Sequence, residues 1–154
     1  MTIPMFKDIL KGKVVIVGIG NKMRGDDGFG PALVGEIEGS VKAVCIDAGN
    51  SPENYTGKIA NENPDTVLLV DAVHLDLKPG EYEILKSSEI EKSGFTTHDI
   101  SPRMFIEYLK NRTGADIYML GIQPENISLG ARMSPSVKKT LSEISELIAE
   151  ACSA

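Results

Sequence analysis

The sequence lacks the features that define membrane and secreted proteins. None of its apolar runs approaches the roughly 20 residues that a membrane-spanning helix requires. Its first residues do not combine a basic stretch with an apolar one, so we expect no secretory signal. We therefore expect a protein that has no membrane segment and stays in the cytoplasm.

Cysteine is scarce, with only Cys45 and Cys152 in the chain. The two lie far apart and form no Cys-x-x-Cys pair, which argues against a disulfide scaffold and against a zinc knuckle. Cys45 falls inside an apolar stretch, where cysteine behaves as a small hydrophobic residue, so we do not expect it to be a nucleophile. A reducing compartment is the expectation.

Positive charge is also limited. The chain has 16 lysines and arginines against 22 acidic residues, which gives a formal net charge of −6. Nonspecific binding to nucleic acid needs a basic face, and the longest basic cluster, Lys138-Lys139, is explained by a solvated helix surface. We expect no nucleic-acid partner, and a basic or cation-bearing partner is electrostatically easier.

What the sequence does contain is an alternation of strands and helices. Buried strands are predicted at Lys13–Ile19, Val41–Ile46, Thr66–Val70 and Ile117–Ile122, and an edge strand at Glu81–Leu85. Helices are predicted from about Phe29, over Ser51–Asn63, over Ser101–Arg112 with Met104, Phe105, Tyr108 and Leu109 on one side, and over Ser134–Ala151. The polar stretch Lys86–Thr97 carries no such pattern.

This alternation predicts the fold class. It is typical of an α/β three-layer sandwich, with a mainly parallel twisted sheet of about five strands and helices on both faces. The edge strand at Glu81–Leu85 is expected to be antiparallel. Because no linker or internal repeat interrupts the pattern, residues 1–154 are predicted to form a single domain.

Three polar side chains near the ends of apolar runs are the main indication of function. Asp27 lies in the glycine-rich loop after the first strand, Asp71 follows the third strand, and His98 lies in a threonine-flanked loop. Segments beyond the carboxyl ends of parallel strands converge on one crevice. Two carboxylates and an imidazole in that crevice suit a divalent-metal or acid–base site.

Each candidate also has an ordinary structural explanation. Asp26 is best explained as a helix N-terminal acid, which leaves Asp27 as the side chain directed into the crevice. Asp71 fits a cap after a strand, and His98 fits a surface position. Asp47, at the end of the second strand, could reach the crevice or belong to a turn. His74, the second histidine, is a further ligand, a supporting partner or a loop residue.

The glycine-rich loop departs from the two common nucleotide-binding motifs. A dinucleotide fingerprint needs a third glycine where this chain has Met23, and a P-loop needs Lys and Ser or Thr where it has Asp26 and Asp27. Adjacent carboxylates repel a phosphate at short range. A Rossmann-like nucleotide-binding protein is therefore a minor alternative.

Taken together, these motifs resemble the maturation proteases of [NiFe] hydrogenases. The resemblance is carried, in chain order, by Gly18–Asn21, Gly25–Gly30, Val70–Ala72, Thr96–His98 and Gly121–Pro124. The last two motifs look closest to the branch that matures the hydrogenase 3 large subunit. The resemblance implies an endopeptidase that removes a C-terminal extension from the large-subunit precursor after nickel has been inserted.

The resemblance also implies roles for individual residues. Asp27, Asp71 and His98 would be the metal-binding and catalytic residues, and Asp47, with Gly20 and Asn21, would recognise the substrate. His74 departs from the family pattern, because similar proteins often have an acidic residue there. The implied partner is the hydrogenase precursor, and the protein is expected to be a monomer.

Chemistry leaves two mechanisms open for such a site. In one, a resident divalent cation activates water and polarises the scissile carbonyl. In the other, the same three groups capture nickel carried by the substrate, which would restrict cleavage to loaded precursor. A nickel-sensing chaperone that cuts nothing would need the same ligands and is the main alternative of a different functional class.

Overall fold

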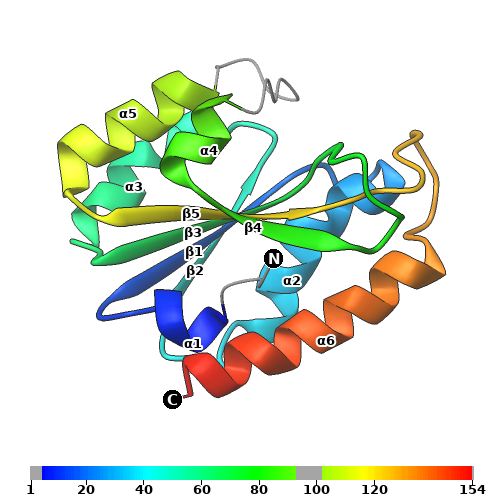
Figure 1. The fold of residues 1–154 in the computed structure, drawn as a ribbon, viewed down its shortest axis with the longest axis horizontal. Helices are drawn as coiled ribbons and strands as arrows, with labels where there is room; N and C mark the ends of the chain where they lie inside the picture. Colours follow the sequence, from blue (N-terminus) through cyan, green and yellow to red (C-terminus); the bar gives the residue numbers. More distant parts are fainter. Residues whose placement is uncertain (1–4, 93–101, 154) are drawn as a thin grey trace.

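The structure, a computed structural model, describes residues 5–92 and 102–153 of the chain. A single five-stranded sheet with the order β2-β1-β3-β5-β4 runs through the molecule (Figure 1). Its strands are β1 (Val14–Ile19), β2 (Val44–Gly49), β3 (Thr66–Ala72), β4 (Tyr82–Lys86) and β5 (Asp116–Ile122). All neighbours pair in parallel except β4, which runs antiparallel to β5. The predicted sheet and its antiparallel edge are confirmed.

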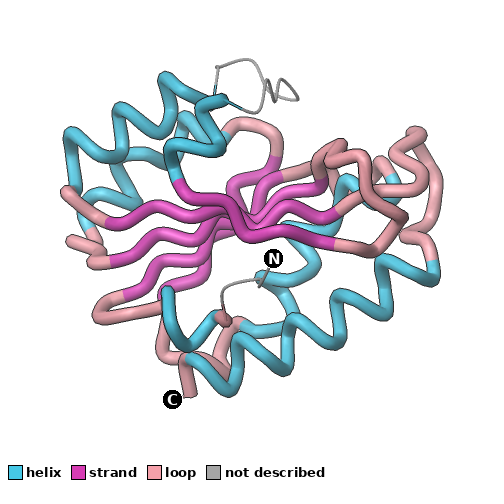
Figure 2. The backbone as a smooth tube through the Cα atoms, in the orientation of Figure 1, coloured by secondary structure: helices cyan, strands magenta, loops and turns pink. Residues whose placement is uncertain are grey.

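Helices cover both faces of the sheet (Figure 2). One face carries α1 (Phe6–Ile9), α2 (Phe29–Ile37) and α6 (Pro135–Ala151), and the other carries α3 (Thr56–Asn61), α4 (Ser87–Lys92) and α5 (Pro102–Thr113). Two short 3-10 helices, η1 (Gly25–Gly28) and η2 (Pro52–Tyr55), precede α2 and α3. No helix in the described ranges is long and apolar enough to cross a membrane.

Alternation along the strands divides the core into two layers. In β3, Leu68 and Val70 pack with α2 and α6, whereas Val67 and Leu69 pack with α3 and α5. Because successive strand residues point to opposite faces, Asp71 continues the row of Val67 and Leu69. The Asp71 side chain therefore lies on the sheet face that α3, α4 and α5 cover.

Two strands extend further toward their carboxyl ends than the sequence predicts. β2 runs to Gly49 and β3 to Ala72, so Asp47 and Asp71 lie inside strands instead of after them. The extension is supported by neighbours, because Asp71 pairs with Gly121 of β5 and Asp47 pairs with Gly18 of β1. Tertiary pairing here overrides the low strand propensity of aspartate.

The helical predictions are confirmed for α2 and α6 and need correction elsewhere. In α5 the side chains of Phe105, Ile106 and Leu109 are buried, whereas Met104 and Tyr108 are exposed, so the predicted inner face is rotated. The stretch predicted as one helix from Ser51 is η2 followed by α3. Two short helices, α1 and α4, were not predicted.

Candidate functional site

The loop from β1 to η1 folds back on itself at the carboxyl end of β1. Gly20 has a φ of 140°, and a Cβ atom there would lie 1.9 Å from the carbonyl oxygen of Asp27. Only glycine accepts this conformation and this close approach. The turn brings the Asn21 backbone N–H to the carboxylate of Asp27, to whose Oδ2 it donates at 2.9 Å. Gly20 and Asn21 therefore fix the orientation of the half-buried Asp27 side chain.

Asp26, the neighbouring carboxylate, is not a simple helix cap. Its side chain is fully buried, and it accepts hydrogen bonds from the backbone N–H groups of Glu125, Asn126 and Ser134 at 2.8, 3.0 and 2.7 Å. The Ser134 hydroxyl donates to it as well. The prediction of a local cap is wrong, because the donors lie about a hundred residues away. Asp26 joins η1 to the loop between β5 and α6.

The same hydrogen bonds determine the charge state of Asp26. Burial opposes ionisation and by itself raises the pKa of this carboxyl group, but the donors from Ser134, Asn126 and Glu125 together outweigh burial. The net result is a pKa below the ordinary value of 3.8. Asp26 is therefore ionised at neutral pH and holds its loop partners through charge-assisted hydrogen bonds.

Asp71 lies at the end of the most buried strand. Its side chain is fully buried in β3, and η1 contacts this strand. Gly30, the second residue of α2, lies so close that a Cβ there would be 2.5 Å from the carbonyl oxygens of both Ile19 and Val70. The turn that carries Asp27 is thus seated on the carboxyl ends of β1 and β3, at the same edge of the sheet as Asp71.

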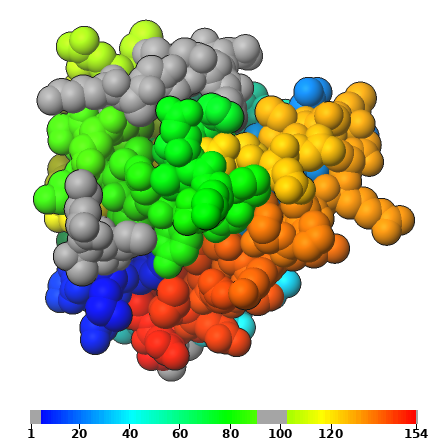
Figure 3. Space-filling view, turned by 45° about the vertical axis from the view of Figure 1, so that its right-hand side comes forward, coloured from blue at the N-terminus to red at the C-terminus, as the bar shows by residue number. Residues whose placement is uncertain are grey.

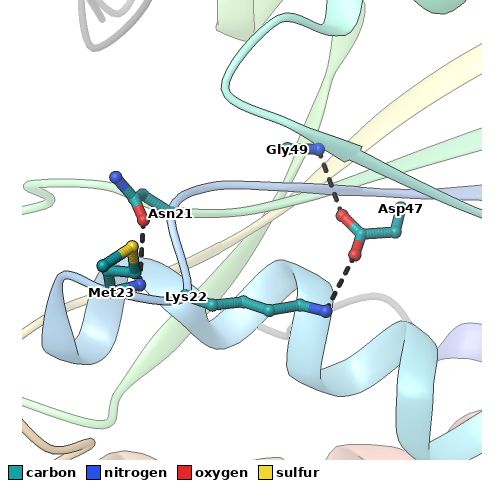
Figure 4. A network of polar contacts seen from close by, with 5 residues as sticks. All are labelled: Asn21, Lys22, Met23, Asp47 and Gly49. Carbon is teal, nitrogen blue, oxygen red and sulfur yellow. Dashed lines mark hydrogen bonds and ion pairs between the residues drawn. The ribbon is translucent and has the colours of Figure 1, made fainter.

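Asp47 projects from the other side of this edge. Its exposed carboxylate accepts a hydrogen bond from the Gly49 backbone N–H at 3.1 Å and forms an ion pair with Lys22 at 3.2 Å (Figure 4). Lys22 belongs to the same turn as Asn21, whose side-chain oxygen accepts the Met23 N–H at 2.8 Å. The structure therefore links Asp47 to the loop of Asp27 through Lys22.

His74 is exposed and lies beside the buried amide of Gln123, a residue that the sequence patterns do not single out as part of the site. Gln123 is 4% exposed, and its Nε2 lies 3.3 Å from His74 Nδ1. Its Oε1 accepts the N–H of Leu75 at 2.6 Å, which fixes the loop after β3 to the end of β5. The motif Gly121–Pro124 was the signal that could have indicated this residue.

The structure describes two of the three predicted ligands, Asp27 and Asp71. The structure brings the turn of Asp27 to the strand of Asp71, whereas His98 lies outside the described residues. Among the residues that are described, no three His, Cys, Asp or Glu side chains are grouped to hold a metal ion. In the chain, His98 falls between α4 and α5, the helices that cover the face of Asp71. The shared site of Asp27, Asp71 and His98 stays a prediction.

The geometry gives no support to a phosphate-binding loop. Such a loop needs backbone N–H groups directed at the ligand. Here the Asn21 N–H is taken by the Asp27 carboxylate, and the Asp26 N–H donates to the Asn126 carbonyl at 2.9 Å. The Asp27 carboxylate at this turn would also repel a phosphate at short range.

Comparison with known proteins adds an independent finding. The sequence profile of a family described as hydrogenase maturation protease matches residues 31–151. The hydrogenase 3 maturation protease of Escherichia coli strain K12 is 35% identical over 133 residues, which cover 84% of this chain and 85% of that protein. The profile match includes Asp47, Asp71 and His98 and begins just after the loop of Asp27.

Solved structures agree with the sequence comparison. A [NiFe] hydrogenase maturation protease, HycI, from Thermococcus kodakarensis superposes with a TM-score of 0.87 at 36% identity, covering 94% of this chain and 96% of that one. The endopeptidase HycI from Escherichia coli superposes with a TM-score of 0.80 at 30% identity, covering 90% of both chains. The sequence and the fold therefore point to the same relatives.

Proposed function

This chain belongs to the hydrogenase maturation protease family, and from that premise we propose the reaction it performs. It is an endopeptidase that removes the C-terminal extension of a [NiFe] hydrogenase large-subunit precursor after nickel has been inserted. The relatives named as hydrogenase maturation proteases support this assignment. We further propose that Asp27, Asp71 and His98 recognise the nickel and carry the chemistry.

One observation supports the site assignment most strongly. Two carboxylates come from adjacent parallel strands to the same edge of the sheet, Asp71 within β3 and Asp27 in the turn that contacts β3. Asp71 faces the helices α4 and α5, and the segment between them contains His98. Ligands of open α/β sheets bind at this carboxyl edge.

The donor set fits a first-row divalent metal. Carboxylate oxygens and an imidazole nitrogen are acceptable ligands for nickel, and the precursor's own ligands would complete the coordination. We propose that the ion arrives with the substrate and is not a resident cofactor. Held between the precursor and these side chains, the ion would polarise the scissile carbonyl.

The chain's own residues supply positioning and proton transfer. The Asn21 N–H donates to Oδ2 of Asp27 and so fixes the orientation of this carboxylate. Asp71 is fixed by the strand that bears it and is shielded from solvent, which strengthens its electrostatic interactions. One of these two carboxylates is the base that accepts a proton from the attacking water.

Further parts of the assignment follow from the same premise. Asp47, with Gly20 and Asn21, is assigned to substrate recognition, because Lys22 ties Asp47 to the site loop. Both cysteines are free thiols, which suits a reducing cytoplasm. The protein acts there as a monomer on the precursor, with no nucleic acid involved.

The deciding experiment is a cleavage assay with two forms of one precursor. Purified large-subunit precursor, loaded with nickel or left without it, is incubated with the protein, and its intact mass is measured. We expect loss of the C-terminal extension only from the nickel-loaded form. If the protease is incubated with free nickel before it meets the unloaded precursor, the unloaded precursor should still not be cleaved.

Two results would contradict the proposal. An intact C-terminus on loaded precursor that nevertheless binds the protein would favour the nickel-sensing chaperone. Cleavage of both precursor forms after the protein has been charged with a divalent metal, and loss of that cleavage on chelation, would favour a resident cation. The Asp71→Asn variant is the matched control, since it should not cut the loaded precursor.

A further inference from the structure

Three large apolar side chains remain exposed on two loops at the functional edge of the sheet. Met23 is 69% exposed, Ile127 is 45% exposed and Leu129 is 67% exposed. The loops are in contact, because the backbone N–H of Gly130 donates to the Met23 carbonyl at 2.7 Å. Figure 3 shows the gold-to-orange segment around residues 123–134 standing out at the rim of the molecule. Large apolar side chains exposed on adjoining loops are a feature of protein interaction sites.

A hollow with positive charge adjoins these apolar residues. It has a volume of about 360 Å³ and is lined by Lys22, Gly25, Gly28, Ala32, Ala131, Arg132, Met133 and Lys138. No acidic side chain is among them, although the chain as a whole carries a net charge of −6. Asp47 offsets the charge of Lys22, whereas Arg132 and Lys138 form no ion pair with any residue in the described ranges.

We propose that the apolar residues and the cationic hollow together form a docking surface for the body of the precursor protein. The surface, defined by Met23, Ile127, Leu129, Arg132 and Lys138, would receive an acidic patch of the precursor that surrounds an apolar contact. This inference rests on the proposed function and adds to it a second contact, separate from the residues that cut.

The position of the hollow favours the precursor as occupant. Gly25 and Gly28 line it, and they flank Asp26 and Asp27. A protein seated there has its exposed chain end within reach of the Asp27 edge. A second copy of this chain, which is itself acidic, would match the charge of the hollow but would cover the approach to its own substrate site.

The surface is also held in a fixed arrangement before any partner arrives. Asp26 accepts hydrogen bonds from Glu125, Asn126 and Ser134, which bracket the exposed residues of the second loop. The Asp26 N–H returns a bond to Asn126. A preorganised surface loses less entropy on association, so modest contacts yield useful affinity.

The test reverses charge and removes apolar surface separately. In Arg132→Glu/Lys138→Glu, we expect the KM for nickel-loaded precursor to rise by about tenfold at low salt, with kcat unchanged, because these charges act on encounter and docking. At higher salt, the KM of this variant should come closer to the KM of wild type. Leu129→Ser should raise the KM by a similar factor that does not depend on salt.

Matched controls separate docking from general effects of charge and stability. Lys139→Glu reverses an exposed charge next to Lys138 but outside the hollow, and Met5→Ser removes an exposed apolar side chain elsewhere. Both should keep the wild-type KM. If the docking variants also keep it while wild type cleaves, the docking surface is refuted and the proposed function stands.

The affinity of each variant for the precursor is measured as well, so that the docking surface is tested even if wild type does not cleave the precursor. Biolayer interferometry with uncleaved precursor should show weaker affinity for the docking variants than for the Lys139→Glu control, and equal affinities overturn the inference. Sedimentation of the protein alone tests the other occupant. If wild type dimerises and the docking variants are monomers with unchanged affinity for precursor, the surface binds a second copy and the inference is wrong.

Discussion

At each end of the sheet, an aspartate carboxylate accepts backbone N–H groups and joins two segments of the chain, but the two carboxylates differ in burial and in number of donors. At the amino end, the exposed carboxylate of Asp65 accepts the Lys13 backbone N–H at 2.7 Å and so fastens the start of β1 to β3. At the carboxyl end, Asp26 fastens η1 to the loop after β5, but it does so fully buried and with four donors. One carboxylate closes an edge, and the other supports a site.

The difference shows how a site can present a carboxylate without losing its geometry. The proposed role of Asp27 requires an accessible carboxylate, which only a few protein groups can hold. Its neighbour Asp26 instead holds the surrounding loops together, because buried charge-assisted hydrogen bonds are stronger than exposed ones. The amino end has no accessible carboxylate to position, and a weaker, exposed contact is sufficient there.

The largest expected effect is a loss of cleavage activity on substitution at the carboxyl end of the sheet but not at the amino end. Asp71→Asn keeps the shape of the side chain and removes its charge, and we expect cleavage of nickel-loaded precursor to fall by about 10²–10⁴-fold. His98→Ala should also abolish cleavage. Thermal unfolding of each variant shows whether the protein remains folded. Asp65→Asn, at the opposite end, should cleave at the wild-type rate. Wild-type cleavage by either Asp71→Asn or His98→Ala would mean that the catalytic residues have been assigned wrongly.

The second effect is on stability, which should fall more on substitution of Asp26 at the carboxyl end than of Asp65 at the amino end. Asp26→Ala leaves three backbone N–H groups and a hydroxyl without their acceptor, so we expect the free energy of unfolding to fall by about 3 kcal/mol. Asp65→Ala removes a single exposed acceptor and should cost about 1 kcal/mol or less. Urea unfolding measures both. Equal losses at the two ends would show that burial does not strengthen the Asp26 contacts.

A smaller effect appears only in acid. The pKa of Asp26 is lowered in the folded protein, so its contribution to stability is complete above the ordinary value of 3.8 and is lost as pH falls through the folded pKa. The melting temperatures of wild type and Asp26→Asn, followed from pH 7 downward, should therefore converge below about pH 4. Parallel curves over the whole range would mean that Asp26 does not carry this linkage.

The sequence was sufficient for the layers and the order of elements, because these follow from local periodicity. It failed where long-range contacts decide the outcome. The local sequence predicts a helix cap at Asp26, because its partners lie about a hundred residues further along the chain. Asp71 and Asp47 were placed after strands, whereas pairing with Gly121 and Gly18 extends those strands through them.

The short helices show a second reason for failure. α4 lies in a stretch without helical periodicity, and Ile90 is its one buried apolar residue within the part whose side chains are described. In α5, Met104 and Tyr108 are large, mostly apolar side chains like the buried Phe105 and Leu109, so composition alone does not decide which side faces the core. The loop motifs around Asp27 and Gln123 were visible as patterns, but their hydrogen-bond partners were not.

The smallest expected effect concerns Cys45 in the edge strand β2, a residue that the proposed chemistry does not use. Cys45 in β2 pairs with Ile16, and burial, with negative charge at Glu38 and Cys152, raises its pKa from 9.0 to about 11. Cys45→Ala should therefore leave cleavage of the precursor unchanged. In a Cys152→Ala background, iodoacetamide at pH 8 should label the Cys45 thiol slowly, as followed by mass spectrometry, because burial and Glu38 still keep the pKa of this thiol above its ordinary value. Rapid labelling at that pH, or slower cleavage by Cys45→Ala, would show that the thiol is reactive and that chemistry is not confined to the carboxyl edge.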